Sequence, residues 1–432
     1  MRRSRPPSNA RSAPTSGAGS HHEQTAVSGS DKQDNLYIAY LKKQGVGNIH
    51  IGQGYGPIDA LHAREPIDWF VYTSALPMEQ PDAPELRFCK EHGIKTTKRD
   101  DFLNFLLQEK GLRLIAVAGT HGKTTTTAMV IWLMKQLGIP ISYSVGAKLS
   151  FGEMGEFDPS STYFVYEADE FDRNFLAFHP YIAIITGIDW DHPDIYPTRE
   201  SYNEAFRQFL QQSERIVMWR NDAELLAADT ARVGIIDADD PRISELVLPG
   251  LVNRQDAFEV AYALQKLTGK SLSQLIGYLN RFPGVSRRFE QIAANLYSDY
   301  AHTPPKIRGA LQLAHEVAGG NVVVVYEGLH NTRQHFIKKE LRDLFEKVKQ
   351  LYIVPTYLAR EDPNLPLLSP DDIKNLLSSE TQEHSQAAVL DDTLAAVITK
   401  HLGQGDLVLC ITAGGGNSLD EWVRKAFRQE LP

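Results

Sequence analysis

Short apolar runs alternate with helical stretches along most of the 432-residue chain. A run of about four to eight apolar residues bounded by turn-forming residues is typical of a strand buried inside a parallel sheet. Residues 115–118, 163–166, 181–185, 321–326, 351–354 and 407–411 show this pattern. Helices are predicted between the strands, for example over 128–137 and 257–268. The alternation predicts an α/β protein with parallel sheets.

The chain divides into a tail and three α/β blocks. Residues 25–111, 112–284 and 285–432 each contain strands and helices, and Phe282-Pro-Gly284 is a linker between the last two blocks. The first 22 residues are rich in Arg, Ser, Pro and Gly and contain no acidic residue. Such a segment buries too little apolar surface to fold. We expect residues 1–24 to be a disordered tail, or to come from a mis-assigned start of the coding sequence.

The amino-acid composition favours a soluble globular protein over a membrane-spanning or nucleic-acid-binding one. Hydrophobic residues make up 42% and charged residues 23% of the chain, which is ordinary for a soluble globular protein. A net charge of −9 argues against non-specific binding to nucleic acid. Cys89 and Cys410 lack the spacing of metal ligands, and no apolar run reaches transmembrane length. We therefore expect a cytoplasmic protein that binds neither nucleic acid nor membrane.

A glycine-bounded turn, Gly119-Thr120-His121-Gly122-Lys123-Thr124-Thr125, links the apolar run 115–118 to the predicted helix 128–137. Strand, glycine-rich turn, Lys-Thr and helix is the build of a loop that holds nucleotide phosphates. Backbone N–H groups and the helix N-terminus face the anion, while Lys123 reaches the terminal phosphates. The Thr124 hydroxyl is a candidate ligand of Mg²⁺. The loop predicts ATP and Mg²⁺ as cofactors.

Polar residues follow the next two predicted strands. Glu167 comes directly after 163–166, and His192 follows 181–185 by a few residues. Ligands of open α/β sheets bind beyond the carboxyl ends of strands, so Glu167 is a candidate Mg²⁺ ligand and His192 a candidate metal or phosphate contact. Taken alone, an acidic strand end is equally well explained as a solvated surface, and a single histidine as a polar or core residue.

The nonamer from Gly119 to Thr127 resembles the ATP loop of the Mur ligase family. The segments 167–172, 186–192, 282–289 and 299–304 resemble further family motifs, E-A-D-E-x-D, T-N-I-x-x-D-H, F-x-G-x-x-R-R-F and D-Y-x-H-x-P. The resemblance implies three domains. These are a Rossmann-like N-terminal domain for the UDP-sugar, a central P-loop ATPase-like domain and a Rossmann-like C-terminal domain for the amino acid.

The resemblance also implies roles for particular residues. Glu167 and His192 correspond to magnesium ligands, Asn253 to a contact of the adenine, and Arg288 to an arginine that contacts ATP. Together with Lys123, the residues Glu167, His192 and Arg288 are the candidates for catalysis. The candidates for substrate binding are Ser74, His302, Arg333 and Arg360.

The sequence departs from the family pattern in several places. Family members open with a strand and a glycine loop for the diphosphate of the UDP-sugar, and both are missing before Val27. We therefore expect an incomplete N-terminal domain, which a frame error or truncation at the start of the coding sequence explains. Gly187 stands where the family has Asn, Val252 where it has His, and Asp256 where it has a second Asn.

Within the family, the loop resembles most the branch that joins L-alanine to UDP-N-acetylmuramate through an acyl phosphate. The resemblance implies these two substrates and a monomer or weak homodimer. Two alternatives stay open at this point. One is a ligase that attaches a recycled murein tripeptide to the same sugar nucleotide, and the other is a nucleotide-binding module without ligase activity.

Overall fold

The computed structural model describes residues 26–427, except 33, 35, 193–194, 359–360 and 413–417. The predicted tail therefore lies outside the described residues. Two compact units are present, one within 26–70 and 80–96, and one made of 71–79 and the chain from 97 onward. The predicted domain boundary at residue 111 falls after α5 (Arg99–Glu109), which is part of the second unit. Among the described residues, no helix is long and apolar enough to span a bilayer.

The first unit is a small α/β assembly. Its strands β1 and β2 pair in parallel, with Ser28 opposite Asn48 and Asp31 opposite Ile51. Ile58, Phe88 and Cys89 form its buried core. Its elements are β1 (Ser28–Asp31), α1 (Leu36–Lys43), β2 (Asn48–Ile51), α2 (Tyr55–Arg64) and α4 (Pro84–Glu91). Strands β3 (Trp69–Tyr72) and β4 (Lys95–Lys98) pair with each other where the chain passes between the units.

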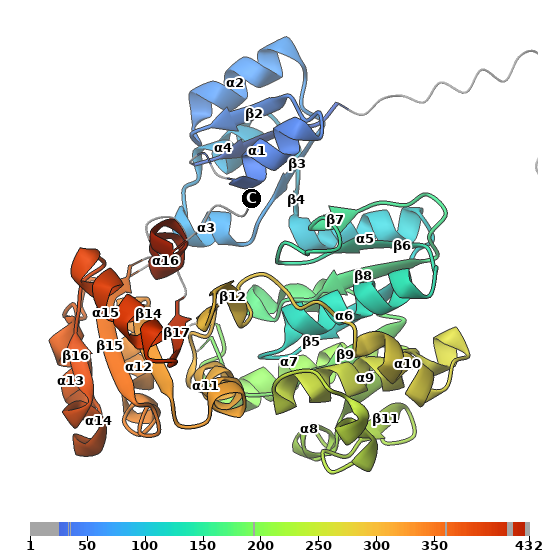
Figure 1. Ribbon diagram of the computed structural model, residues 1–432. Helices are drawn as coiled ribbons and strands as arrows, with labels where there is room; N and C mark the ends of the chain where they lie inside the picture. Colours follow the sequence, from blue (N-terminus) through green and yellow to red (C-terminus); the bar gives the residue numbers. More distant parts are fainter. Residues whose placement is uncertain are drawn as a thin grey trace, which may run out of the picture. The chain divides into compact units, whose positions relative to one another are not determined.

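The second unit contains a central sheet of seven strands in the order β11-β10-β9-β5-β8-β6-β7. Every pair in it is parallel except β6 with β7. The strands are β5 (Arg113–Ala118), β6 (Ile141–Ser144), β7 (Gly155–Glu156), β8 (Tyr163–Glu167), β9 (Ile182–Ile185), β10 (Arg215–Trp219) and β11 (Val233–Ile236). Because β5 lies between β8 and β9, the phosphate loop and the polar ends of both neighbours meet at one edge of the sheet (Figure 1).

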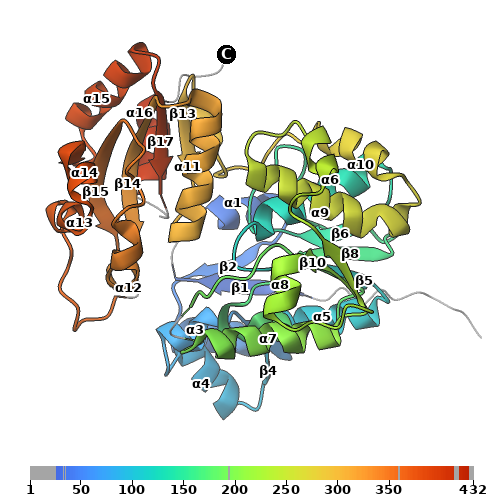
Figure 2. The same cartoon turned by 90° about the horizontal axis from the view of Figure 1, so that it is seen from below.

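Helices cover both faces of this sheet, as Figure 2 shows. One apolar core joins α6, α9 and α10 to one face, and a second joins α5 and α7 to the other. Strand residues are buried on both sides, which explains their continuous apolar runs. The helical elements are α3 (Ala75–Glu79), α6 (Lys123–Gln136), a 3₁₀ segment (Phe171–Ala177), α7 (Arg199–Gln212), α8 (Arg220–Leu225), a second 3₁₀ segment (Pro241–Glu245), α9 (Leu251–Thr268) and α10 (Leu272–Leu279).

A second sheet of six strands follows in the order β12-β13-β17-β14-β15-β16. All its pairs are parallel except β12 with β13. Helices α11 and α13 contribute to the core on one face, and α15 and α16 to the core on the other. The elements are β12 (Glu290–Ala293), β13 (Leu296–Asp299), α11 (Pro304–Ala318), β14 (Val322–Leu329), α12 (Asn331–Leu341), β15 (Gln350–Tyr357), α13 (Pro370–Leu376), α14 (Ser379–Glu383), β16 (Ser385–Ala387), α15 (Asp392–Gly403), β17 (Leu407–Ile411) and α16 (Leu419–Phe427).

The α/β fold class and the parallel sheets agree with the prediction from the sequence. Both of the helices predicted above begin earlier than expected, and α6 starts at Lys123, not at 128. Helix α9 starts at Leu251, not at 257, because Gly250 turns the chain into the helix with a φ of +85°. Asn253 therefore lies in the first turn of α9, so the helix itself holds this residue at the cavity described next.

Candidate active site

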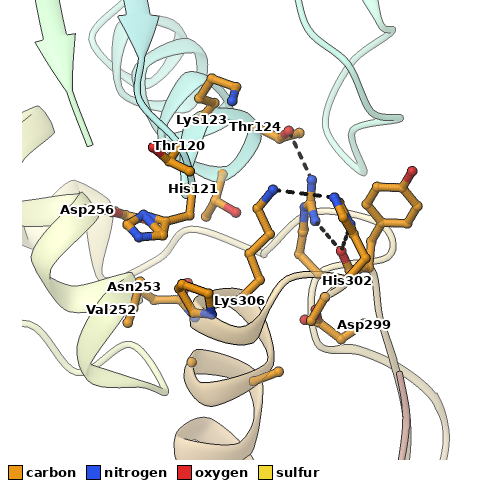
Figure 3. A pocket seen from close by; sticks show the side chains of 18 of the residues that line it. Thr120, His121, Lys123, Thr124, Val252, Asn253, Asp256, Asp299, His302 and Lys306 are labelled. Atoms are coloured by element: carbon orange, nitrogen blue, oxygen red, sulfur yellow. Dashed lines mark hydrogen bonds between the residues drawn. The ribbon is translucent and has the colours of Figure 1, made fainter. Parts of the chain in front are cut away.

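The carboxyl end of the central sheet opens into a cavity of about 420 Å³. Its walls come from the phosphate loop (120–125), from the segments after β8 and β9, and from the start of α9. The C-terminal block closes it with Arg288, the segment 299–302 and the first turns of α11 (Figure 3). Residues far apart in sequence thus surround one space large enough for a bound small molecule.

Two glycines with positive φ set the backbone conformation of the phosphate loop. Gly119 has a φ of +140° and Gly122 a φ of +77°, a region that other residues rarely adopt. A Cβ atom on Gly122 would lie 3.1 Å from Oδ1 of Asp256. The loop thereby brings its backbone close to α9, and Lys123 becomes the first residue of α6. This is the strand–turn–helix geometry that cradles phosphates.

Two side chains anchor the loop to the segment after β9. The Thr120 hydroxyl donates to the carbonyl of Asp189 at 2.6 Å and accepts from its N–H at 2.8 Å. Nε2 of His121 lies 3.2 Å from Oδ2 of Asp189. Burial lowers the pKa of His121 to about 4, assisted by Lys306 and Lys123, so this ring is neutral at pH 7.

Gly187 explains one departure from the family pattern. Its φ is +136°, and a Cβ atom there would lie 2.7 Å from Cε1 of His121. The His121 ring therefore occupies the space that a side chain at 187 needs. Glycine, not asparagine, is compatible with this packing.

Lys123 forms a buried ion pair. Its Nζ donates to the Gly119 carbonyl and to Oε2 of Glu170, both at 2.7 Å. Burial by itself lowers the pKa of Lys123, but the nearby carboxylates of Glu170 and Asp169 outweigh it and raise the pKa above its usual value. The lysine is thus a permanent cation at the phosphate loop. Glu170, which lies in the family-like segment 167–172, is its counter-ion.

Thr124 and Glu167 form an oxygen-rich corner. The Thr124 hydroxyl donates to Oε1 of Glu167 at 2.8 Å, and Oε2 of Glu167 accepts from the N–H of Gly146 at 2.9 Å. Among the described residues, no group of three His, Cys, Asp or Glu side chains is arranged to hold a metal alone. Mg²⁺ is typically bound by one or two carboxylates together with water and substrate phosphates. The oxygens of Thr124 and Glu167 fit that mode of binding.

His192 faces two carboxylates. Its Nε2 lies 3.8 Å from Oε1 of Glu170 and 3.9 Å from Oδ2 of Asp191. Nη2 of Arg333, from α12, lies 3.7 Å from Oδ1 of Asp191. Burial would raise the pKa of Asp191, but His192 and Arg333 outweigh it and lower the pKa to about 2. Asp191, in the central block, therefore forms an ion pair with Arg333, in the C-terminal block.

Arg288 reaches the phosphate loop from the segment that connects the two sheets. One terminal nitrogen donates to the Thr124 hydroxyl at 3.2 Å, and the other to the carbonyl of Tyr300 at 3.3 Å. The guanidinium also lies over the Tyr300 ring, 5.3 Å from its centroid. The arginine is thus held beside the predicted magnesium and phosphate position.

The remaining predicted residues have different locations. Asn253 lines the cavity, and its side-chain amide donates to the Pro249 carbonyl at 2.8 Å. His302 lines the cavity opposite the phosphate loop. Ser74 is not among the residues that line it and accepts a hydrogen bond from Asn174 at 3.0 Å. Arg333 also lies outside the lining, and Arg360 lies outside the described residues.

Lys306 is a residue of the cavity that the sequence analysis missed. It lies in the first turn of α11, after Pro304 and Pro305. A cation is disfavoured at a helix N-terminus because the helix dipole is positive there. That unfavourable position was the signal in the sequence that could have identified it.

The central and C-terminal blocks match models of known domains. Residues 117–240 match the Mur ligase middle domain, and residues 287–414 match the Mur ligase, glutamate ligase domain. A UDP-N-acetylmuramate–L-alanine ligase of Clavibacter sepedonicus is 32% identical over 370 residues, which cover 78% of this chain and 75% of the relative. The chain belongs to the Mur ligase family. The same named ligase of a Nocardioides species is 31% identical over 408 residues, covering 90% of this chain and 87% of the relative.

Solved structures agree with this Mur ligase assignment at the level of the fold. The crystal structure of the UDP-N-acetylmuramate–alanine ligase of Thermotoga maritima matches with a TM-score of 0.70. The match covers 92% of this chain and 91% of that structure at 23% sequence identity. The fold is therefore the three-domain α/β architecture of Mur ligases, as the sequence motifs implied.

Proposed function

We propose that this chain joins L-alanine to the lactyl carboxylate of UDP-N-acetylmuramate at the expense of ATP. The observation that carries the proposal is the contact of Arg288 with Thr124, which places an arginine of the connecting segment on the phosphate loop beside Lys123 and Glu167. Such a constellation suits the transfer of a phosphoryl group. The named relatives supply the identity of the two substrates.

In the first step, an oxygen of the substrate carboxylate forms a bond to the γ-phosphorus of ATP, and the bond to the β-phosphate oxygen breaks. The products of this step are an acyl phosphate and ADP. Lys123 and Arg288 stabilise the negative charge on the transferring group, because both are cations held in place before the reaction. When bound at Thr124 and Glu167, Mg²⁺ would neutralise further charge on the phosphates.

In the second step, the amine of L-alanine attacks the acyl carbon, and phosphate leaves as the amide forms. We assign the binding of the L-alanine carboxylate to Arg333. Its Nη1 is buried without a hydrogen-bond partner among the described residues, and its Nη2 lies near Asp191. A buried guanidinium with an unused donor is suited to bind a carboxylate. We further propose a cytoplasmic location, where both nucleotide substrates are available, and a monomer or weak homodimer.

The test is phosphate release by the purified chain with ATP and Mg²⁺, in the presence and absence of UDP-N-acetylmuramate and L-alanine. Release that requires both substrates is the expected result. Replacing L-alanine by the murein tripeptide L-alanyl-γ-D-glutamyl-meso-diaminopimelate distinguishes the recycling reaction. ATP binding without release under any of these conditions would overturn the proposal in favour of a nucleotide-binding module.

A further inference from the structure

Lys306 places a third cation in the cavity, in addition to Lys123 and Arg288. Its side chain extends from α11 into the space that faces the phosphate loop, and Figure 3 shows its hydrogen bond to His302 as a dashed line. Nζ of Lys306 lies 3.5 Å from Nε2 of His302. No motif of the family resemblance includes this lysine.

The hydrogen bonds of His302 define how Lys306 is held. Nδ1 of His302 lies 3.1 Å from the carbonyl of Tyr300, which can only accept, so Nδ1 carries the proton. Nε2 is then a free acceptor for an N–H of Lys306. Burial and the charge of Lys306 keep the pKa of His302 well below its usual range, which agrees with a neutral ring. His302 is therefore a positioning residue for Lys306.

Lys306 has unused donors and no close counter-ion. In the part of the chain that the structure describes, His302 is its sole side-chain hydrogen-bond partner, and no carboxylate forms an ion pair with it. An ammonium group has three N–H donors, so two remain for another partner. The carboxylates of Asp191 and Glu170 raise the pKa of Lys306 by electrostatic attraction, without forming an ion pair with it.

The environment of Lys306 is unfavourable for a cation in the free protein. Burial and the charges of Lys123 and Arg288 oppose its protonation and lower its pKa to about 8. The N-terminal end of α11 adds the positive end of a helix dipole. An anion placed among the three cations would relieve all of these penalties at once.

We propose that Lys306 is a catalytic residue that binds the phosphoryl group as it passes from ATP to the carboxylate substrate. This inference rests on the proposed function. Lys306 stays protonated through the step and donates hydrogen bonds to non-bridging oxygens of the phosphoryl group. One P–O bond forms to the carboxylate and one P–O bond breaks to ADP, so no proton leaves the lysine.

The first test measures binding, which does not depend on ligase activity. Dissociation constants for ADP and for the non-hydrolysable imido analogue of ATP are measured with Mg²⁺ for wild type and for Lys306→Met, Lys306→Arg and Arg308→Met. Arg308 is the matched control, because it lies on the same helix but is largely exposed and contacts Glu340 at 3.6 Å. We expect Lys306→Met to weaken binding of the analogue about 10-fold and to leave ADP within about 2-fold.

The second test measures turnover with both substrates. We expect kcat to fall about 100-fold in Lys306→Met, to recover partly in Lys306→Arg, and to stay near wild type in Arg308→Met. Equal affinity of Lys306→Met and wild type for the imido analogue, or a Lys306→Met enzyme with wild-type kcat, would overturn the assignment. If wild type itself shows no substrate-dependent turnover, the proposed function fails, while the ratio of analogue to ADP affinities still decides the role of Lys306.

Discussion

Lys123 illustrates how one side chain serves both folding and chemistry. Its ammonium is paired with Glu170, whose side chain is 1% exposed, while the side chain of Lys123 is 13% exposed. Removing one partner of such a pair leaves an uncompensated buried charge, whereas replacing both partners removes that cost. Stability and catalysis can therefore be separated by comparing a single with a double substitution.

The substitution Lys123→Met is expected to destabilise the protein by about 3–5 kcal/mol and to abolish phosphate release. The double variant Lys123→Met/Glu170→Gln should recover most of the stability and none of the activity. Chemical denaturation and the phosphate-release assay measure the two effects. Activity in the double variant would show that Lys123 does not act on the phosphates.

Position 187 has a backbone conformation that favours glycine over the asparagine of the family pattern. Restoring the family residue by Gly187→Asn forces a side chain to a φ of +136° and against His121, which we expect to cost about 1–3 kcal/mol. Gly138→Asn is the control, because Gly138 has a φ of +66° and open space around it, a conformation that asparagine tolerates. Urea denaturation of both variants tests the prediction, and equal stabilities would contradict it.

At the scale of elements, a buried carboxylate joins β15, β17 and α15. Asp406 directly precedes β17 and accepts from Nζ of Lys349 at 2.6 Å, while Nδ1 of His401 lies 2.8 Å from its other oxygen. Burial would raise the pKa of Asp406, but Lys349 and His401 outweigh it and hold the pKa below its ordinary value. The carboxylate is 2% exposed, so these partners replace its water.

Because the folded-state pKa of Asp406 is depressed, its contribution to stability is present above the ordinary pKa of 3.8 and is lost as pH falls through the folded-state value. We expect Asp406→Asn to cost about 1–3 kcal/mol at pH 7, since the buried carboxylate loses its ion pair with the half-exposed Lys349 and its hydrogen bonds. The difference from wild type should shrink below pH 3.8. Denaturation curves between pH 3 and 7 test this, with exposed Asp239→Asn as a control.

At the scale of the whole second unit, Arg288 contacts residues of the candidate active site that belong to both sheets. It is part of the segment between them and donates both to the phosphate loop and to the residue that follows β13. Contacts of this kind assemble a complete site only when both blocks are in place. Each sheet has its own apolar cores, and Arg288 does not belong to them.

We therefore expect Arg288→Met to lower kcat about 100-fold with little change in the midpoint of thermal unfolding. Arg281→Met is the matched control, because Arg281 is exposed in the same connecting region and lies over the Tyr278 ring. Steady-state kinetics and calorimetry provide both readouts. A large drop in unfolding temperature for Arg288→Met would indicate a structural role instead.

The predicted strands and the phosphate loop were readable from the sequence because their signals are local. A strand buried on both faces is recognised from its own continuous apolar run. The phosphate loop is likewise recognised from the segment Gly119 to Thr125 and the strand and helix on either side of it. Glu167 and His192 both line the cavity, and the sequence pointed to them because each lies at or shortly after the end of a predicted strand. The role of Glu170 was not assigned from the sequence because its partner Lys123 lies 47 residues away. Lys306 was missed because it faces a phosphate loop that belongs to the other sheet.

The sequence by itself determined the α/β class, the family and the position of the ATP loop. These follow from local periodicity and from residue types at fixed spacing. The tertiary structure decided which charges meet. It pairs Lys123 with Glu170, holds Arg288 on Thr124, ties Ser74 to Asn174 and leaves Lys306 beside neutral His302. Charge pairing depends on distance and burial, and only the packing of the two sheets sets both.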